Sequence, residues 1–229
     1  MGMNWTWRGV LLYLALFLIH LPSALPQDYS WNNQTLFNLK PMQFRDGSTV
    51  LILHEGGSSS QGPGFACGFF CNQTSDRYLL SIFILFYKGL EIQDTVGPQV
   101  AWSANQTNPA SINATVHLTP DGGLVEQEAD GTIAWSTNIT SESVTGLNLT
   151  DMGNLQLFDR NYSTIWQSLD HPSDSLLLGQ KLLVGQKLTS AASATYHIER
   201  GLFSLYLNSD GLSAFRQSNK GPKRYYHHC

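Results

Sequence analysis

The stretch from Leu118 to Gln167 contains one sequence pattern twice. The first copy, LTPDGGLVEQEADGTIAWS, occupies residues 118–136. The second, LTDMGNLQLFDRNYSTIWQ, occupies residues 149–167, so the two align without a gap and Leu118 matches Leu149. A short internal repeat of this kind is typical of a unit that buries its apolar face against its own copies. The repeat therefore predicts a fold built from several similar units.

Each copy has the pattern of two strands joined by a turn. The strand-forming residues are Leu124, Val125, Leu155, Leu157 and Phe158. The chain would reverse at Asp130-Gly131 in the first copy and at Asn161-Tyr162 in the second. We therefore expect a β-hairpin from each copy.

Three tryptophans extend the repeat towards the amino terminus. Trp135 and Trp166 occupy equivalent positions late in the second strand. Trp102 precedes Trp135 by nearly the same interval and lies in a similar context, WSAN against WSTN. Three tryptophans at two near-equal spacings predict three sheets around a pseudo-threefold axis, each contributing one indole to a shared core. The alternative is a β-sandwich with three unrelated core tryptophans.

Residues 1–24 have the composition of a secretory signal peptide, with Arg8, an apolar run over residues 10–21, and small residues at Ser23 and Ala24. A membrane anchor is the alternative, but the run is shorter than the roughly 20 residues that a spanning helix needs. We expect a secreted, soluble mature chain without a membrane span.

The composition of the chain bears on which classes of binding partner are expected. Only 13% of residues are charged and the net charge is −4, which gives no reason to expect nucleic acid or an anionic membrane. Seven N-glycosylation sequons in the mature chain favour the secretory pathway and an exposed surface. They begin at Asn33, Asn72, Asn105, Asn113, Asn138, Asn148 and Asn161.

The cysteines leave the disulfide pairing open. Cys67 and Cys71 are near enough in sequence for a small disulfide loop, and a bridge from either one to Cys229 is an alternative. The odd count suggests a chain that stops inside a larger architecture, or an accidental terminal cysteine.

Neither a catalytic nor a metal site is expected. The stretch SLDHPSDS (168–175) holds Ser, Asp and His, but neighbours on one turn rarely form a hydrolase triad, which gathers residues distant in sequence. The terminal KRYYHHC (223–229) has no second ligand cluster for a metal. We expect no cofactor.

Four segments follow from these patterns: a signal peptide (1–24), an N-terminal segment with a flexible loop (25–64), a β domain (65–190), and a region (191–229) that starts a second β domain. The loop contains EGGSSSQGPG, and the β core begins near Phe65 with a buried strand over residues 78–87. In the last region, LNSDG (207–211) resembles LTPDG (118–122), and the sequence that follows LNSDG is one residue shorter than the sequence that follows LTPDG.

Three motifs resemble the bulb-type (G-type) lectin domain of plants, found in S-locus glycoproteins and in the ectodomains of lectin S-receptor-like kinases. They are VAWSANQTNPASINATVHLTPDGGLV (100–125), GLNLTDMGNLQLFD (146–159) and TIWQSLDHPSDSLLLGQKL (164–182). FACGFFCNQT (65–74) and GLFSLYLNSDGLSAF (201–215) are similar to the subgroup with a PAN-type module. The resemblance covers residues 65–190 and implies an all-β, β-prism II fold of three four-stranded sheets.

In mannose-binding members of that family each sheet carries the strand Gln-x-Asp-x-Asn-x-Val-x-Tyr, whose alternate side chains share one face. The five positions in the first repeat are Thr119, Asp121, Gly123, Val125 and Gln127, which keep only Asp and Val. Those in the second are Thr150, Met152, Asn154, Gln156 and Phe158, which keep only Asn. A third set, Asn208, Asp210, Leu212, Ala214 and Arg216, keeps only Asp.

Because each lost hydrogen bond costs about 1 kcal/mol, these degenerate positions predict weak mannose binding or none. Asp121 and Asn154 are the polar candidates for contact with another glycan, supported by Thr119, Val125 and Gln127. The alternative to a glycan contact for Asp121 and Asn154 is a hydrogen bond that stabilises a turn or a strand edge. Asn148 lies two residues before Thr150, so both side chains should lie on the same face of the strand. We therefore expect a glycan on Asn148 to shield the sugar site of the second repeat.

Two functions remain open. The first is a secreted lectin-like glycoprotein that binds a carbohydrate or a glycoprotein at the plant cell surface. The second is a protein-interaction module without sugar binding, either a fragment or a soluble form of a receptor-like kinase ectodomain. The resemblance adds a homodimer as one arrangement, since bulb lectins often exchange strands.

Overall fold

The structure, a computed structural model, describes residues 29–32, 49–55, 61–71, 77–88, 91–92, 99–140, 143–193, 196–217 and 223–228. Within these ranges the regular secondary structure is almost entirely β-strand, which confirms the all-β prediction. The single helix in these ranges is a short 3-10 turn, η1 (Ser168–Asp170).

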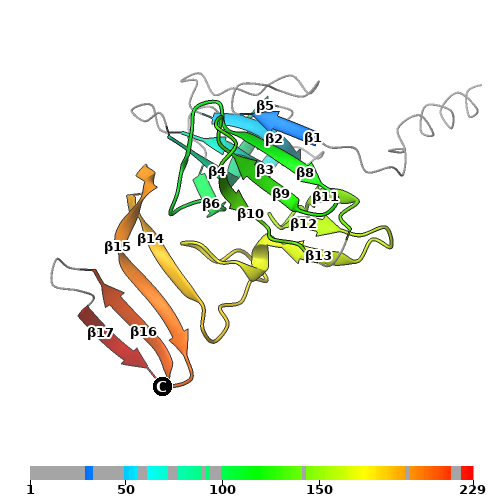
Figure 1. Ribbon diagram of the computed structural model, residues 1–229. Coiled ribbons are helices and arrows are strands. Elements are labelled where there is room, and N and C mark those ends of the chain that lie inside the picture. The colour runs from blue at the N-terminus through cyan, green and yellow to red at the C-terminus, as the bar shows by residue number, and fades with distance from the viewer. Residues whose placement is uncertain are drawn as a thin grey trace, which may run out of the picture.

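Three antiparallel sheets form the amino-terminal and central part of the molecule (Figure 1). The first sheet contains β2 (Thr49–Glu55), β3 (Gln61–Phe70), β4 (Arg77–Lys88), β5 (Glu91–Ile92), β6 (Gln99–Ser103) and β7 (Ala110–Ser111). The second contains β1 (Tyr29–Asn32), β8 (Thr115–Thr119), β9 (Gly123–Gln127) and β10 (Ile133–Ser136). The third contains β11 (Gly146–Leu149), β12 (Leu155–Phe158) and β13 (Thr164–Gln167). The predicted tryptophans lie on β6, β10 and β13, one in each sheet.

The two repeats form the same hairpin. The N–H of Glu128 donates to the carbonyl of Thr132 at 2.8 Å, and at the matching position of the second repeat the N–H of Asp159 donates to the carbonyl of Ser163 at 3.1 Å. Both bonds close the turns that join β9 to β10 and β12 to β13. The predicted reversals at 130–131 and 161–162 are therefore confirmed.

Carboxylates hold both turns. Asp130 accepts from the N–H of Thr132 at 2.9 Å, and Asp159 accepts from the N–H groups of Ser163 and Asn161 at 2.9 Å and 2.8 Å. These bonds favour the charged form and lower the pKa of each exposed carboxyl below its ordinary value. Both turns therefore keep their shape while the carboxyls are ionised.

A cross-strand pair of large apolar residues from each sheet points into the core. These pairs are Phe69 with Leu80, Leu118 with Leu124, and Leu149 with Leu155. All six side chains are buried. Side chains alternate between the two faces of a strand, so placing these pairs inward turns the neighbouring residues of β9 and β12 outward.

The β structure begins earlier than the sequence predicts. β1 pairs with β8, joining Tyr29 to Leu118, and β2 pairs with β3. The boundary at Phe65 is therefore too late, because strands within residues 25–64 belong to the same sheets. β1 has only four residues and carries no copy of the repeat. The expected signal peptide, 1–24, lies outside the described residues.

The Cys67–Cys71 disulfide, one of the pairings left open by the sequence, does not form in the structure. Cys67 is a buried free thiol on β3, and Cys71 follows the last residue of that strand. Four residues of extended strand span about 13 Å, whereas a disulfide needs Cα atoms roughly 4.4–6.8 Å apart. Cys229 lies outside the described residues.

A separate four-stranded sheet follows, called here the C-terminal sheet. It contains β14 (Lys187–Ser193), β15 (Tyr196–Asn208), β16 (Gly211–Arg216) and β17 (Lys223–His228). Leu207 pairs with Leu212 as Leu118 pairs with Leu124, across a turn one residue shorter. This is the missing residue that the sequence comparison indicates. The sheet starts at Lys187, before the expected boundary at 191.

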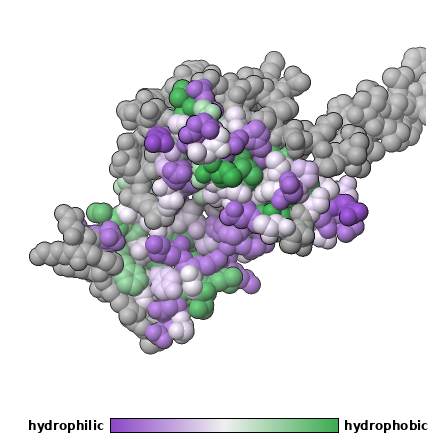
Figure 2. Space-filling view, in the orientation of Figure 1, coloured by the Kyte–Doolittle hydropathy of each residue, from purple (hydrophilic) through white to green (hydrophobic). Residues whose placement is uncertain are grey.

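The C-terminal sheet exposes apolar side chains on one face. Phe203 is 60% exposed, Leu205 is 39% exposed and Leu212 is 40% exposed. The register pairs Leu205 with Ala214 and Leu207 with Leu212, so these residues share a face with Phe203. Figure 2 shows hydrophobic residues on the visible surface of this sheet. The corresponding leucines of the other sheets are buried.

Candidate functional site

The sugar-pattern residues of the first repeat lie on or beside the outward face of β9. Asp121 is exposed in the turn before the strand, and Val125 and Gln127 are partly exposed. The N–H of Gly122 donates to Oγ1 of Thr119 at 3.0 Å, and Nε2 of Gln127 donates to the carbonyl of Gly131 at 2.8 Å. Two of the predicted polar groups therefore brace turns of their own hairpin.

Asn154 is buried in the second repeat. Its Nδ2 donates to Oε1 of Gln167 at 2.9 Å, while its Oδ1 accepts from Oγ of Ser168 at 3.3 Å and from the N–H of Leu169 at 3.4 Å. Only 6% of the residue is exposed. The candidate role of Asn154 in direct glycan contact is contradicted, because its carboxamide joins β12 to the turn after β13.

The outward face of the third sheet carries Asn148. Asn148 is exposed and pairs directly with Gln156, one of the five sugar-pattern positions. Directly paired residues present their side chains on the same face. A glycan on Asn148 would emerge beside this position, so shielding of the second site stays a prediction.

The seven sequons differ in accessibility. Asn113, Asn138, Asn148 and Asn161 are exposed, whereas Asn33 and Asn72 lie outside the described residues. Asn105 is 2% exposed. Its Oδ1 accepts from the N–H of Leu80 at 2.9 Å, and its Nδ2 donates to the carbonyl of Tyr78 at 3.2 Å. The expectation of an exposed sequon at Asn105 is therefore wrong, because the folded protein uses both ends of its carboxamide.

The three tryptophans meet at the centre of the three sheets. Trp102, Trp135 and Trp166 contact one another in pairs, with ring centroids 6.1, 6.1 and 6.0 Å apart and interplanar angles of 75°, 70° and 72°. Edge-to-face pairs of this kind contribute about 0.5–1.5 kcal/mol each beyond their burial. This near-symmetric geometry confirms the predicted pseudo-threefold core and excludes the sandwich alternative.

A hydrogen bond that the sequence analysis missed occurs once in each sheet. A polar side chain two or three residues after the tryptophan accepts from the N–H of a buried leucine. The pairs are Leu80 with Asn105 at 2.9 Å, Leu124 with Thr137 at 3.1 Å, and Leu155 with Ser168 at 3.0 Å. Hydroxyl or amide groups at Trp+2 or Trp+3 could have indicated it.

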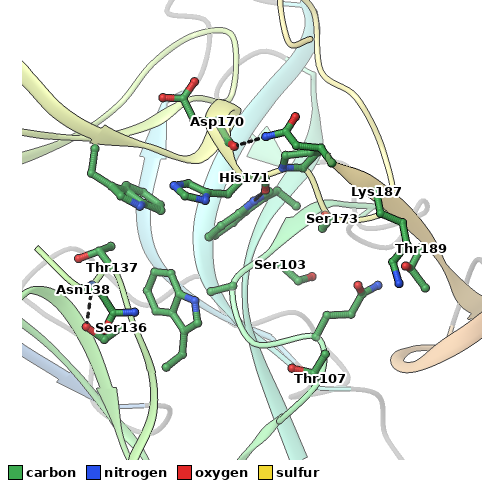
Figure 3. A pocket seen from close by; sticks show the side chains of 17 residues that line it. Ser103, Thr107, Ser136, Thr137, Asn138, Asp170, His171, Ser173, Lys187 and Thr189 are labelled. Carbon is green, nitrogen blue, oxygen red and sulfur yellow. Dashed lines mark hydrogen bonds between the residues drawn. The ribbon is translucent and has the colours of Figure 1, made fainter. Parts of the chain in front are cut away.

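A pocket of about 530 Å³ opens beside the three indoles, and we call it the tryptophan pocket (Figure 3). Most of its other described lining side chains are neutral hydrogen-bonding groups, among them Gln106, Thr107, Asn138 and Thr189. Apart from the His171 imidazole, the ionisable side chains in the described lining are those of Asp170 and Lys187. The pocket is therefore aromatic at its base and largely uncharged on its walls.

Several contacts fix the wall that is formed after β13. The indole N–H of Trp102 donates to the carbonyl of His171 at 2.6 Å. The His171 ring stacks on Trp166, with centroids 5.3 Å apart and an interplanar angle of 14°. Nε2 of Gln186 donates to the carbonyl of Asp170 at 2.7 Å. Contacts with the core residues Trp102 and Trp166 therefore hold this wall in place.

Other pocket groups are available to a ligand. Within the described part of the chain, the side chains of Gln106, Thr107, Asn138, Lys187 and Thr189 make no hydrogen bond. They present amide, hydroxyl and ammonium groups to the pocket. Such groups can bind hydroxyls without first breaking a contact of their own.

The Ser-Asp-His stretch has structural contacts. The Ser168 hydroxyl is buried between Asn154 and the N–H of Leu155, and His171 lies on Trp166. Among the described residues, no group of three or more His, Cys, Asp or Glu side chains is placed to hold a metal. No helix in the described ranges is long and apolar enough to cross a membrane.

Comparison with known proteins agrees with this architecture. Residues 99–195 match the D-mannose binding lectin family. The epidermis-specific secreted glycoprotein EP1 of Daucus carota is 37% identical over 161 residues, which cover 69% of this chain and 40% of EP1. EP1-like glycoprotein 2 of Arabidopsis thaliana is 37% identical over 158 residues, covering 68% of this chain and 33% of that protein.

A G-type lectin S-receptor-like serine/threonine-protein kinase of Arabidopsis thaliana is 38% identical over 119 residues, covering 52% of this chain and 14% of the kinase. The chain thus spans less than half the length of each of these relatives. The family match and the prism around the three tryptophans identify this chain as a bulb-type lectin domain protein.

Proposed function

We propose that this protein is a secreted lectin-like glycoprotein that binds a neutral carbohydrate, free or on a glycoprotein, at the plant cell surface. The observation that carries the proposal is the tryptophan pocket, where aromatic rings meet unengaged neutral polar groups. The role is binding rather than catalysis. Support for an extracellular location comes from the relative named as a secreted glycoprotein and from four exposed sequons.

The chemistry of the pocket suits a sugar ring. The C–H face of a sugar packs on the π-face of an indole, and its hydroxyls need several donors and acceptors at the edge. Trp135 is the least buried of the three tryptophans and lines the pocket beside Asn138. A volume of about 530 Å³ lies within the roughly 300–1,000 Å³ of small-molecule sites.

The outward strand faces support sugar binding less well. Thr119 and Gln127 are engaged with their own turns, and Asn154 is buried. Asp121 is the remaining exposed polar candidate in the first repeat. Since a shallow site needs several simultaneous bonds of about 1 kcal/mol each, one carboxylate gives little affinity.

A glycan-array screen of the secreted protein, followed by titration of its best ligand, tests the proposal. The double variant Gln106→Ala/Thr107→Val removes two pocket hydrogen-bonding groups and should bind at least about tenfold more weakly. Asp121→Ala is the matched control and should bind as the wild type does. Loss of binding in Asp121→Ala alone would move the site to the strand face, and absence of all glycan binding would overturn the function.

A second function is favoured by the apolar face of the C-terminal sheet. Phe203, Leu205 and Leu212 expose large apolar surface of the kind that protein interfaces bury. A protein-interaction module, including a homodimer or part of a receptor-like kinase ectodomain, would use this face. Sedimentation of the wild type beside Phe203→Ser distinguishes a dimer that depends on this face from a monomer.

A further inference from the structure

We propose that an N-linked glycan on Asn138 is a built-in ligand of the tryptophan pocket, so that glycosylation of this residue regulates the pocket. The inference rests on the proposed function of the pocket. It adds which glycan occupies the pocket and how glycosylation controls the binding of other glycans. The chemical class of the ligand is the N-acetylglucosamine core of an N-glycan. The observations that carry it are the position, conformation and hydrogen bonding of Asn138.

Asn138 lies on the wall of the pocket. It is exposed, it follows Trp135 by three residues, and both residues line the same cavity (Figure 3). Its φ of 53° places it in the left-handed region, which Asn tolerates better than most residues. The first sugar, attached at Nδ2, would therefore start at the wall beside the indole.

The equivalent sequon at Asn105 shows why Asn138 is available. Both asparagines lie three residues after a tryptophan. In the first sheet the residue at Trp+2 is Ala104, which has no hydroxyl, and Asn105 accepts from the N–H of Leu80 instead. In the second sheet Thr137 accepts from the N–H of Leu124. The carboxamide of Asn138 is therefore not needed by the fold.

A tethered sugar fills even a weak site. A short flexible link gives an effective concentration in the millimolar range. For an intrinsic Kd of about 1 mM and a tethered sugar at about 5 mM, mass action raises the apparent Kd for a free competitor roughly sixfold. The glycosylated form would therefore bind outside glycans less tightly than the unglycosylated form.

The test uses the full secreted chain and two sequon variants. Thr140→Ala removes the Asn138 sequon at an exposed position and leaves Asn138 in place. Ser163→Ala removes the Asn161 sequon, which lies in the turn between β12 and β13, and serves as the matched control. Mass spectrometry first establishes glycan occupancy. Acrylamide quenching of tryptophan fluorescence and titration with N,N′-diacetylchitobiose then report on the pocket.

We expect Thr140→Ala to show greater quenching than the wild type and to bind chitobiose roughly sixfold more tightly, while Ser163→Ala matches the wild type in both. Asn138 without a glycan in the wild type would overturn the inference. Equal quenching in Thr140→Ala and the wild type would overturn it as well. Greater quenching in Thr140→Ala without chitobiose binding would also overturn the inference, because the pocket would then not bind the N-acetylglucosamine core. Greater quenching and tighter chitobiose binding in Thr140→Ala, with no ligand on the array, would support the built-in ligand while the proposed binding of outside glycans fails.

Discussion

Leu80 donates its amide N–H to Oδ1 of Asn105 at 2.9 Å, so a buried strand of the first sheet depends on the side chain of an N-glycosylation sequon. The same carboxamide donates to the carbonyl of Tyr78 at 3.2 Å. A glycan would remove one of its two amide hydrogens and would have to occupy a buried position. Folding and modification at this asparagine therefore compete.

We expect Asn105 to be unmodified in secreted protein, in contrast to the exposed Asn113. Asn105→Ala should lower the free energy of unfolding by about 1–3 kcal/mol, because it leaves buried backbone groups unpaired. Asn148→Gln, at an exposed position on β11, is the control and should change stability little. Peptide mapping by mass spectrometry and urea unfolding measure the two quantities. A glycan found on Asn105 of the folded protein would contradict the assignment.

Asn154→Ala should likewise destabilise the protein by about 1–3 kcal/mol, since Ser168 and the N–H of Leu169 lose their acceptor. Glycan affinity of the remaining folded protein should be unchanged. Comparing the urea midpoint with a glycan titration separates the two effects. Reduced affinity with unchanged stability would instead restore Asn154 as a contact residue.

Glu126 should make stability depend on pH. Its carboxyl is fully buried on β9 without a hydrogen-bond partner, opposite Val116 of β8 and Trp135 of β10. Burial, with a smaller contribution from the negative charge of Glu128, raises its pKa from 4.5 to about 8. Stability from this group is therefore fully present below about pH 4.5 and is lost as the pH rises towards 8, by up to about 1.4 kcal/mol per pH unit.

Glu126→Gln removes this titration, and its thermal midpoint should vary less between pH 5 and pH 8 than that of the wild type. The variant should also be the more stable protein at the upper end of this interval. Asp121→Asn, at an exposed position, is the control and should keep the wild-type slope. Equal slopes for wild type and Glu126→Gln would show that another group causes the pH dependence.

Cys67 should be chemically inert in the folded protein. Burial raises the pKa of its thiol to about 12, so the reactive thiolate is scarce at neutral pH. Alkylation at pH 8 followed by peptide mapping should leave Cys67 unmodified until denaturant is added. Rapid labelling of Cys67 under native conditions would mean that β3 opens readily.

Spacing alone was enough to predict the centre of the fold. A gapless repeat related Trp135 to Trp166, and a similar interval reached Trp102, so the meeting of the three indoles followed from sequence. The first sheet was harder to recognise because a longer connection separates β4 from β6 than separates β9 from β10. β1 was missed because it has four residues and pairs with a strand far along the chain.

The candidate site was less predictable. Because side chains alternate between the two faces of a strand, Asn154 is expected on the same outward face as Gln156. In the structure the turn after β13 covers Asn154. The exposure of a side chain at the end of a strand depends on the neighbouring turn, and the alternation of side chains along the strand does not predict where that turn lies. The pocket was also not predictable from the sequence, because its walls come from four separate parts of the chain: the segment after β6, β10 with the residues after it, the segment after β13, and β14.

The pairing of β1 with β8 also sets the order in which the molecule can assemble. The hairpins β8–β9 and β12–β13 join strands that are neighbours in sequence, so they can form as soon as they are synthesised. β1 emerges first during translation, yet its partner lies in the middle of the chain. Closing so large a loop costs entropy before any strand bond repays it. We therefore expect the second sheet to be completed only after its local hairpin has formed.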